Sequence, residues 1–145
     1  LMGMASDYRL LSNHPKNRVG MSEINIGVPL SAVQTAVMRF GLDTDITYRD
    51  LIYFGELMGP EDALKKKIVD ELLPPEALMD RAKTIVSSWM DTPGTPFIRL
   101  KQEFRRDAAV DMEKKLLDKE RYQKLDFFLN KEVKATLIKV QASMA

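Results

Sequence analysis

The chain has 145 residues, with 22 basic and 21 acidic side chains and a formal net charge of +1. This length can bury a hydrophobic core, and the balanced charge argues against a basic surface that binds nucleic acid. The absence of cysteine excludes disulfides, thiolate chemistry and cysteine-ligated zinc. We therefore expect a folded protein that does not bind nucleic acid.

The single histidine and the short apolar runs argue against a metal site and against a membrane-spanning segment. His14 is the only histidine, so a multi-histidine metal site is not expected, and its polar surroundings predict a surface loop without a catalytic role. No apolar run approaches the ~20 residues needed to span a membrane, and no signal peptide is visible. The C-terminal Ser-Met-Ala does not match a peroxisomal Ser-Lys-Leu address. We expect no membrane insertion and no bound metal.

The first third of the chain predicts short strands separated by loops. Residues 2–6 are expected to finish a buried helix, with the small Gly3 and Ala5 allowing close packing on a sheet. Residues 8–11 predict a core strand, ended by a polar loop. The alternation of Val19, Met21 and Glu23 predicts a second strand with the carboxylate on its apolar side.

Helix start signals dominate the next stretch. Ser31 is a candidate N-cap for a helix that ends at Gly41, and Thr47 is a candidate N-cap for the next helix. Gly59-Pro60-Glu61-Asp62 combines a first-turn proline with acidic residues, which is typical of a helix start. Residues 68–73 predict a short extended segment before Pro74-Pro75.

The remainder of the chain predicts helices only. An apolar stripe from about Pro75 to Trp89 predicts a helix in which Trp89 is a core or interface residue. Residues 91–96 break it, and apolar positions at helical spacing then recur at 97–104, 110–128 and 132–140. The architecture is thus a β/α part over residues 1–75 and a helical part over residues 76–145.

The sequence pattern alone does not decide whether Glu23 is a functional residue. A carboxylate on an apolar side is either an edge residue facing water or a buried functional group. Most strand carboxylates are solvated. Composition and periodicity therefore favour an ordinary surface residue over a catalytic one.

Three sequence blocks, in order, resemble the crotonase (enoyl-CoA hydratase/isomerase) superfamily. They are Asp7-Tyr8-Arg9, then Val19-Gly-Met-Ser-Glu23-Ile-Asn-Ile-Gly27-Val-Pro29, then Ala63-Leu64 with Ile68-Val-Asp-Glu-Leu-Leu-Pro74. The resemblance implies an α/β (α+β) fold in which residues 1–75 form the C-terminal part of a ββα spiral core. It implies that residues 76–145 form a helical region that assembles a homotrimer or a dimer of trimers.

The same resemblance implies an acyl-CoA thioester substrate and no separate cofactor, because CoA is part of the substrate. In the superfamily two backbone N–H groups stabilise the thioester oxyanion, and both would lie upstream of Leu1. Since the resemblance begins inside a helix of the family's domain, we interpret the chain as the C-terminal part of a longer protein. The expected location is the cytoplasm in a bacterium, and in a eukaryote the mitochondrial matrix is an option.

The resemblance also predicts which side chains act. Typical hydratases use two glutamates; one position corresponds to Glu23 and the other to Leu1, which cannot transfer a proton. One acid opposite a leucine is similar to Δ3-Δ2-enoyl-CoA isomerases, as is the tail around Phe127-Phe128-Leu129-Asn130-Lys131. We therefore predict that Glu23 carries a proton from C2 to C4, while Leu1 lines the substrate site and keeps water out.

Two weaker substrate-binding candidates follow. Gly27 allows a close backbone approach to the substrate, although a simple turn explains a glycine there almost as well. Lys139 lies near a position where relatives contact CoA, but Leu137 and Val140 stand where some relatives have phenylalanine and lysine.

The leading prediction is an isomerase, and two alternatives remain open. The first is another crotonase-type reaction: hydration, dienoyl isomerisation, decarboxylation or thioester hydrolysis. The second is a non-catalytic homologue whose helices only build oligomers. A fully packed, dry wall around Glu23 would support that second alternative, and a polar site wall would oppose it.

Overall fold

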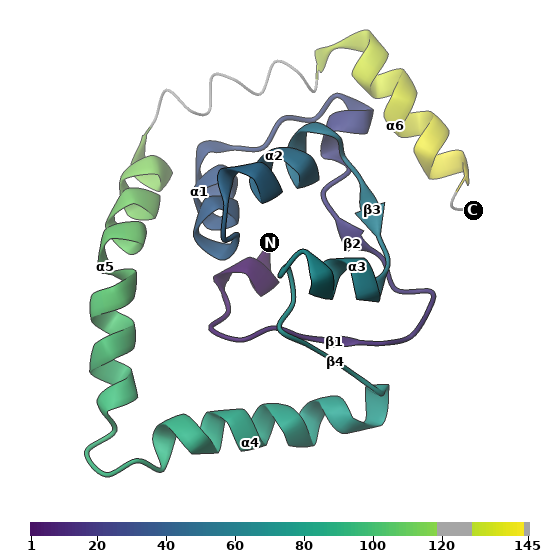
Figure 1. Cartoon of the computed structure of the whole chain (residues 1–145). Helices are drawn as coiled ribbons and strands as arrows, with labels where there is room; N and C mark the ends of the chain where they lie inside the picture. Colours follow the sequence, from purple (N-terminus) through teal and green to yellow (C-terminus); the bar gives the residue numbers. More distant parts are fainter. Residues whose placement is uncertain (119–128, 144–145) are drawn as a thin grey trace.

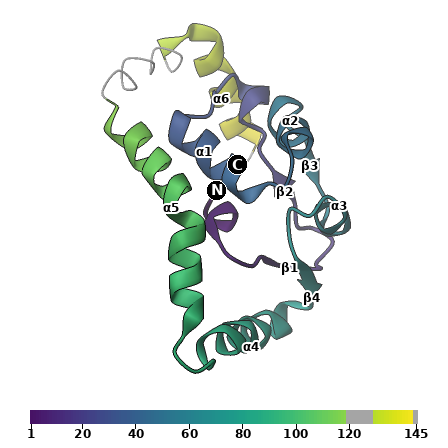
Figure 2. The same cartoon turned by 60° about the vertical axis from the view of Figure 1, so that its left-hand side comes forward.

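The structure is a computed structural model that describes residues 1–118 and 129–143. Figure 1 shows a compact N-terminal part with the long helices α4, α5 and α6 arranged around it, and Figure 2 shows the same arrangement from a second direction. The predicted apolar positions Leu125 and Phe128, and the Phe127-Phe128 part of the tail resemblance, lie outside the described residues.

Short strands and helices alternate up to β4, and helices follow it. In chain order the elements are the 3-10 helix η1 (Met2–Ala5), β1 (Leu10–Ser12), β2 (Val19–Gly20), the 3-10 helix η2 (Glu23–Ile26), α1 (Ala32–Gly41), α2 (Asp45–Tyr53), β3 (Leu57–Met58), α3 (Pro60–Lys65), β4 (Glu71–Leu73), the 3-10 helix η3 (Pro75–Ala77), α4 (Leu78–Met90), α5 (Pro96–Leu117) and α6 (Lys131–Ser143). In the described part of the chain, the strands thus lie before residue 75 and the elements after β4 are helices.

Two small sheets organise the first part. Strands β1 and β4 pair in parallel, with Leu10 opposite Glu71 and Leu11 opposite Leu72. Strands β2 and β3 pair in the antiparallel sense over two residue pairs only, Val19 with Met58 and Gly20 with Leu57. The predicted strands near residues 8–11 and 68–73 are confirmed, each beginning two or three residues later than expected.

The predicted strand through Glu23 is wrong. Pairing with β3 ends at Gly20, and Glu23 begins the 3-10 helix η2 instead. Within that turn the Val28 N–H donates to the Glu23 carbonyl oxygen at 3.0 Å, and the Asn25 N–H donates to the Ser22 carbonyl oxygen at 3.0 Å. Because these backbone groups are used locally, no ladder can continue through the segment.

The N-terminal segment also differs from expectation. It forms a single 3-10 turn, η1, in which Met4 is the buried residue. Gly3 and Ala5 are exposed, and a Cβ atom built at Gly3 would meet nothing within 4 Å. The expected close packing of these small residues against a sheet is therefore wrong.

Capping side chains set the starts of α1 and α2. The Ser31 hydroxyl accepts from the Gln34 N–H, and the Gln34 side chain accepts from the Ser31 N–H, which completes a capping box and confirms the predicted cap. Thr47 is not the cap of α2. Thr44 has the extended conformation of an N-cap, and its Oγ1 accepts the Thr47 N–H at 3.1 Å.

A hydrophobic core joins η1, α1, α2, β3 and α3. Its buried residues are Met4, Met38, Leu42, Tyr48, Leu51, Met58, Ala63, Ile68 and Val69. Ile68 and Ala63 are both 0% exposed, and Met38 is 1% exposed. The core therefore lies between the two sheets and the helices that follow β2.

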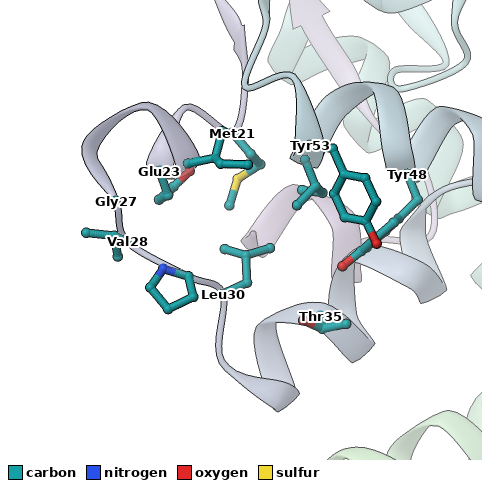
Figure 3. Close-up of a pocket in the computed structure, with 11 residues that line it drawn as sticks. Met21, Glu23, Gly27, Val28, Leu30, Thr35, Tyr48 and Tyr53 are labelled. Atoms are coloured by element: carbon teal, nitrogen blue, oxygen red, sulfur yellow. The ribbon is translucent and has the colours of Figure 1, made fainter. Parts of the chain in front are cut away.

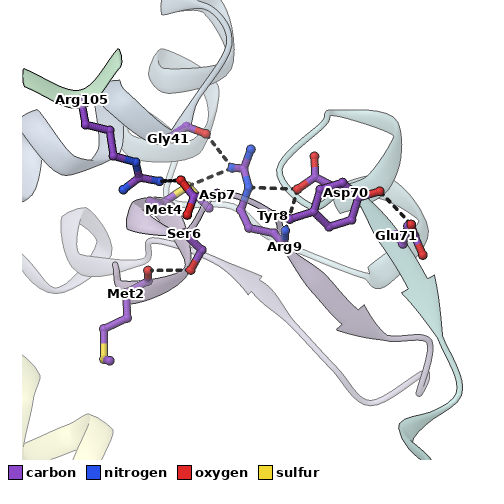
Figure 4. Close-up of polar contacts among 10 residues, drawn as sticks. All are labelled: Met2, Met4, Ser6, Asp7, Tyr8, Arg9, Gly41, Asp70, Glu71 and Arg105. Carbon is purple, nitrogen blue, oxygen red and sulfur yellow. Dashed lines mark hydrogen bonds and ion pairs between the residues drawn. The ribbon is translucent and has the colours of Figure 1, made fainter. Parts of the chain in front are cut away.

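Ion pairs attach α5 and α4 to this core. Asp7 accepts from Lys101 at 2.6 Å and from Arg105 at 2.5 Å, which holds α5 against the segment after η1. Figure 4 shows the Arg105 contact and, beyond it, the Tyr8 hydroxyl donating to Glu71 Oε1 at 2.7 Å. Asp7 thus connects the segment after η1 to α5.

Glu71 and Arg81 form the matching link to α4. The Arg81 guanidinium donates to both carboxylate oxygens of Glu71. The hydrogen bonds from Arg81 and then from Tyr8 lower the pKa of Glu71 from its usual 4.5 to about 2. The same contact raises the pKa of Arg81 and of Tyr8. Glu71 is therefore a charged anchor between β4 and α4.

Aromatic stacking closes the turn between α4 and α5. The Trp89 and Phe97 rings are stacked at 4.8 Å, and Tyr8 meets Trp89 edge-on at 6.4 Å. The prediction of Trp89 as a packing residue is confirmed. Leu100 and Phe104, however, remain 68% and 79% exposed. Within the described part of the chain, no helix has the length and apolar character required to cross a membrane.

We expect Ile68→Ala to lower the free energy of unfolding by about 2–5 kcal/mol, because it empties a fully buried site. The matched control is Ile46→Ala in α2, where the side chain is 63% exposed and the change should stay within about 0.5 kcal/mol. Urea unfolding followed by Trp89 fluorescence measures both. Equal losses in the two variants would contradict the placement of the core.

The Glu71 anchor predicts a pH dependence of stability. Its folded-state pKa lies below its usual 4.5, so its stabilisation is complete above about pH 4.5 and is lost as the pH falls toward about 2. Glu71→Gln should therefore lose less stability on acidification over that range than the parent protein. Exposed Glu76→Gln serves as the control, and unfolding at a series of acidic pH values measures the slope. Parallel slopes for the parent and Glu71→Gln would contradict the assignment.

Candidate active site

A cavity of about 580 Å³ opens beside η2. One side is the chain from the end of β2 to the start of α1, and the other is α2. Figure 3 shows Met21 and Glu23 on one side, Tyr48 and Tyr53 on the other, and Leu30 between them. The lining residues are Met21, Glu23, Ile24, Gly27, Val28, Pro29, Leu30, Thr35, Tyr48, Ile52 and Tyr53.

Glu23 is the ionisable acid of this cavity. It is half-buried at the first position of η2. Its Oε2 atom is buried and has no hydrogen-bond partner within the described part of the chain. Buried carboxylate oxygens are normally paired, so an unpaired one on a residue that lines a cavity marks a candidate functional group.

The surroundings of Glu23 are largely apolar. Among the described residues that line the cavity, it is the only carboxylate, and the other polar side chains are Thr35 and the two tyrosines. Such a site can hold an apolar ligand beside a single proton-transferring group. The described lining supplies no second acid to position and activate a water molecule.

Gly27 shapes the turn that carries Glu23. Its φ of +72° is left-handed, and its N–H closes the end of η2 on the Ile24 carbonyl oxygen at 3.1 Å. A Cβ atom at Gly27 would lie 3.0 Å from Cγ2 of Val133 in α6. The close approach at Gly27 is therefore to α6, although the glycine also lines the cavity.

The structure brings Glu23 and Gly27 together but does not bring Leu1 or Lys139 into the same cavity lining. Leu1 precedes η1 and is 44% exposed. Lys139 is exposed on α6. Their predicted roles at the substrate remain predictions.

Sequence reasoning missed the α2 wall of the cavity. The sequence predicted a helix here but gave no role at the site to the three lining residues Tyr48, Ile52 and Tyr53. Tyr48 and Ile52 are four residues apart and so share one helix face, which was the available signal. Tyr48 is 9% exposed and meets Tyr53 edge-on at 6.3 Å. Nothing in the local sequence says that this face meets η2.

Within residues 1–118 and 129–143, no three histidine, cysteine or acidic side chains lie close enough together to hold a metal ion.

Curated relatives at low sequence identity are isomerases. The chain is 25% identical over 114 residues to mitochondrial enoyl-CoA delta isomerase 1 of Mus musculus, covering 77% of this chain and 38% of that protein. It is 27% identical over 96 residues to the Homo sapiens protein of the same name, covering 64% of this chain and 30% of that protein. The chain thus spans less than two fifths of the length of these relatives.

Solved structures establish the fold. Human mitochondrial delta3-delta2-enoyl-CoA isomerase matches with a TM-score of 0.71 and 21% identity, over 98% of this chain and 56% of that chain. An enoyl-CoA hydratase from Mycobacterium marinum matches with a TM-score of 0.67 and 19% identity, over 78% of this chain and 49% of that chain. The fold is therefore of the crotonase type, as predicted.

The family assignment comes from the sequence profile. The enoyl-CoA hydratase/isomerase family profile matches residues 1–141, which is nearly the whole chain. That match agrees with the fold and with a carboxylate placed at an apolar cavity. The chain belongs to the enoyl-CoA hydratase/isomerase family.

Proposed function

We propose that the protein is an acyl-CoA thioester isomerase that moves a carbon–carbon double bond from position 3 to position 2, with Glu23 as the proton carrier. The observation that carries this proposal is the unpaired, buried Oε2 of Glu23 at an apolar cavity. The isomerase names of the curated relatives support it.

The reaction needs two proton transfers and no other reactant. The Glu23 carboxylate takes a proton from C2 of the 3-enoyl thioester, and the electron pair of that C–H bond moves toward the thioester carbonyl. The protonated Glu23 then returns the proton to C4, which leaves the double bond between C2 and C3. One carboxylate within reach of both carbons completes the cycle.

The apolar wall has a separate role in this proposal. Met21, Leu30 and Ile52 would contact the acyl chain and leave little room for ordered water near the reacting carbons. Excluding water favours isomerisation over hydration, because hydration requires a water molecule held by a second polar group.

The two alternatives make different demands on the cavity. A typical hydratase site requires two carboxylates, and the described lining contains one. A non-catalytic homologue is expected to have a dry and fully packed wall around Glu23. The wall here is largely apolar, which fits that alternative, but it borders an open cavity of about 580 Å³ and is therefore not fully packed. The cavity favours a ligand site, and its single described carboxylate favours isomerisation over hydration.

The remaining parts of the substrate site are proposals by resemblance. The enolate-like charge requires hydrogen-bond donors at the thioester oxygen, and the resemblance puts them outside these 145 residues. Leu1 and Gly27 are proposed at the acyl part and Lys139 at the CoA part. The mitochondrial names of the relatives support a matrix location if the protein is eukaryotic.

We also propose assembly into a homotrimer, or a dimer of trimers, through the helical region. Exposed apolar side chains on α5 support this, because large apolar residues on a helix surface commonly mark contact sites. They include Leu100, Phe104 and Val110, which are 68%, 79% and 60% exposed.

The test of the reaction uses Glu23→Gln in the protein expressed from its complete reading frame. We expect kcat for converting a 3-enoyl-CoA into its 2-enoyl isomer to fall by about 10²- to 10⁴-fold, since the proton carrier is lost. Exposed Glu76→Gln is the control and should keep full activity. Products are identified by chromatography and mass spectrometry.

Three other outcomes would contradict the proposed isomerase or the proposed role of Glu23. Addition of water to a 2-enoyl-CoA would indicate a hydratase with a second acid elsewhere. Binding of CoA thioesters without conversion of either substrate would indicate a different reaction of the family. Full activity in Glu23→Gln would exclude Glu23 as the proton carrier.

The test of assembly introduces a charge on α5. Leu100→Asp should raise the dissociation constant of the oligomer by at least about 100-fold, because an unpaired carboxylate in an interface costs several kcal/mol. Gln102→Asp adds the same charge to a nearby exposed position as a control. Light scattering measures the mass, and an unchanged mass for Leu100→Asp would place the interface elsewhere.

A further inference from the structure

Asn25 connects the turn that carries Glu23 to the end of α2. It lies two residues after Glu23 in η2, and its Nδ2 donates to the Gly55 carbonyl oxygen at 3.0 Å. Gly55 is in the short connection between α2 and β3. Asn25 is not among the cavity-lining residues, so the contact lies outside the cavity lining.

Gly55 fits tightly against the same turn. Its φ of +59° is left-handed, which favours glycine. A Cβ atom there would lie 2.7 Å from Cγ2 of Ile24 and 2.8 Å from Nδ2 of Asn25. The absence of a side chain therefore allows the Gly55 backbone to rest directly on Ile24 and Asn25.

This contact joins the two walls of the cavity. Glu23 and Ile24 come from the η2 side, and Ile52 and Tyr53 come from the end of α2, directly before the Gly55 connection. The β2–β3 ladder that precedes it ends at the pair Gly20 and Leu57. Beyond that pair, the Asn25 hydrogen bond continues the connection between the two segments.

We propose that Asn25, held on Gly55, is a positioning residue that fixes the Glu23 carboxylate relative to the α2 wall. This inference rests on the proposed isomerisation. Proton transfer between two carbons requires one carboxylate to reach both, and displacements of about 1 Å can reduce rates by about 100-fold. A side-chain hydrogen bond behind the reacting group is the usual way to hold such geometry.

Kinetics of Asn25→Ala test this role in the protein expressed from its complete reading frame. We expect kcat with a 3-enoyl-CoA to fall by about 10- to 100-fold, with KM changed by less than about threefold. Asn25→Asp is nearly isosteric but turns an oxygen toward the Gly55 carbonyl, and it should lose at least as much. It also guards against misfolding caused by the truncation in Asn25→Ala.

Asn17→Ala is the matched control. The Asn17 Nδ2 also donates to a backbone carbonyl oxygen, that of Ser12, at 2.9 Å, but Asn17 lies outside the cavity lining. It should keep kcat within about twofold while losing a comparable hydrogen bond. Equal losses of kcat and of thermal midpoint in the two alanine variants would reduce Asn25 to a structural role and overturn the proposal.

Hydrogen–deuterium exchange gives a readout that requires no substrate. Amides of residues 22–28 should exchange faster in Asn25→Ala than in the parent protein or in Asn17→Ala, because the turn loses its tie to Gly55. Unchanged exchange in this segment would overturn the proposal.

The outcomes distinguish the positioning role of Asn25 from the proposed isomerase activity. If the parent protein isomerises and Asn25→Ala retains kcat, the positioning role is rejected and the isomerase stands. If the parent does not isomerise, the proposed function fails and the positioning role for it fails too, whereas the exchange data still report whether Asn25 orders the turn. Loss of kcat together with faster exchange supports the proposal.

Discussion

Parallel pairing of β1 with β4 holds together the two ends of the chain segment that contains the cavity. It sets Leu10 opposite Glu71, and the elements that lie between these two strands in the sequence are β2, η2, α1, α2, β3 and α3. Arg9, at the edge of this pairing, donates to the Gly41 carbonyl oxygen at 2.6 Å and pairs with Asp70 at 3.5 Å, which links α1 to β4 (Figure 4). The η2 turn and α2 both belong to this segment, and together they line the cavity.

Much of the fold follows from local sequence signals. Ser31 specifies the start of α1 because a hydroxyl at the N-cap satisfies a free backbone N–H. Pro60 and the acidic residues after it favour the start of α3 by a different route, because the fixed φ of proline suits the first turn and negative charge is stabilised at a helix N-terminus. Glu23 and Gly27 were identified through a motif, and the structure puts both at one cavity.

The features that sequence did not predict depend on contacts between distant segments. The alternation at Val19, Met21 and Glu23 suits a strand, but the partner strand is two residues long, so the chain turns at Glu23. Two threonines near α2 are both possible caps, and only the backbone conformation selects Thr44. The tyrosines of α2 line the cavity because of how α2 packs on η2, which periodicity does not encode.

The contact between Gly27 and Val133 has a consequence for the order of synthesis. Because synthesis proceeds from the N-terminal end, Glu23 is added to the chain more than a hundred residues before Val133. The η2 turn therefore acquires its neighbour in α6 only after Val133 has been added to the chain. A ribosome-bound nascent chain can therefore contain Glu23 while it still lacks α6, so the η2 turn forms its contact with that helix later than its own hydrogen bonds.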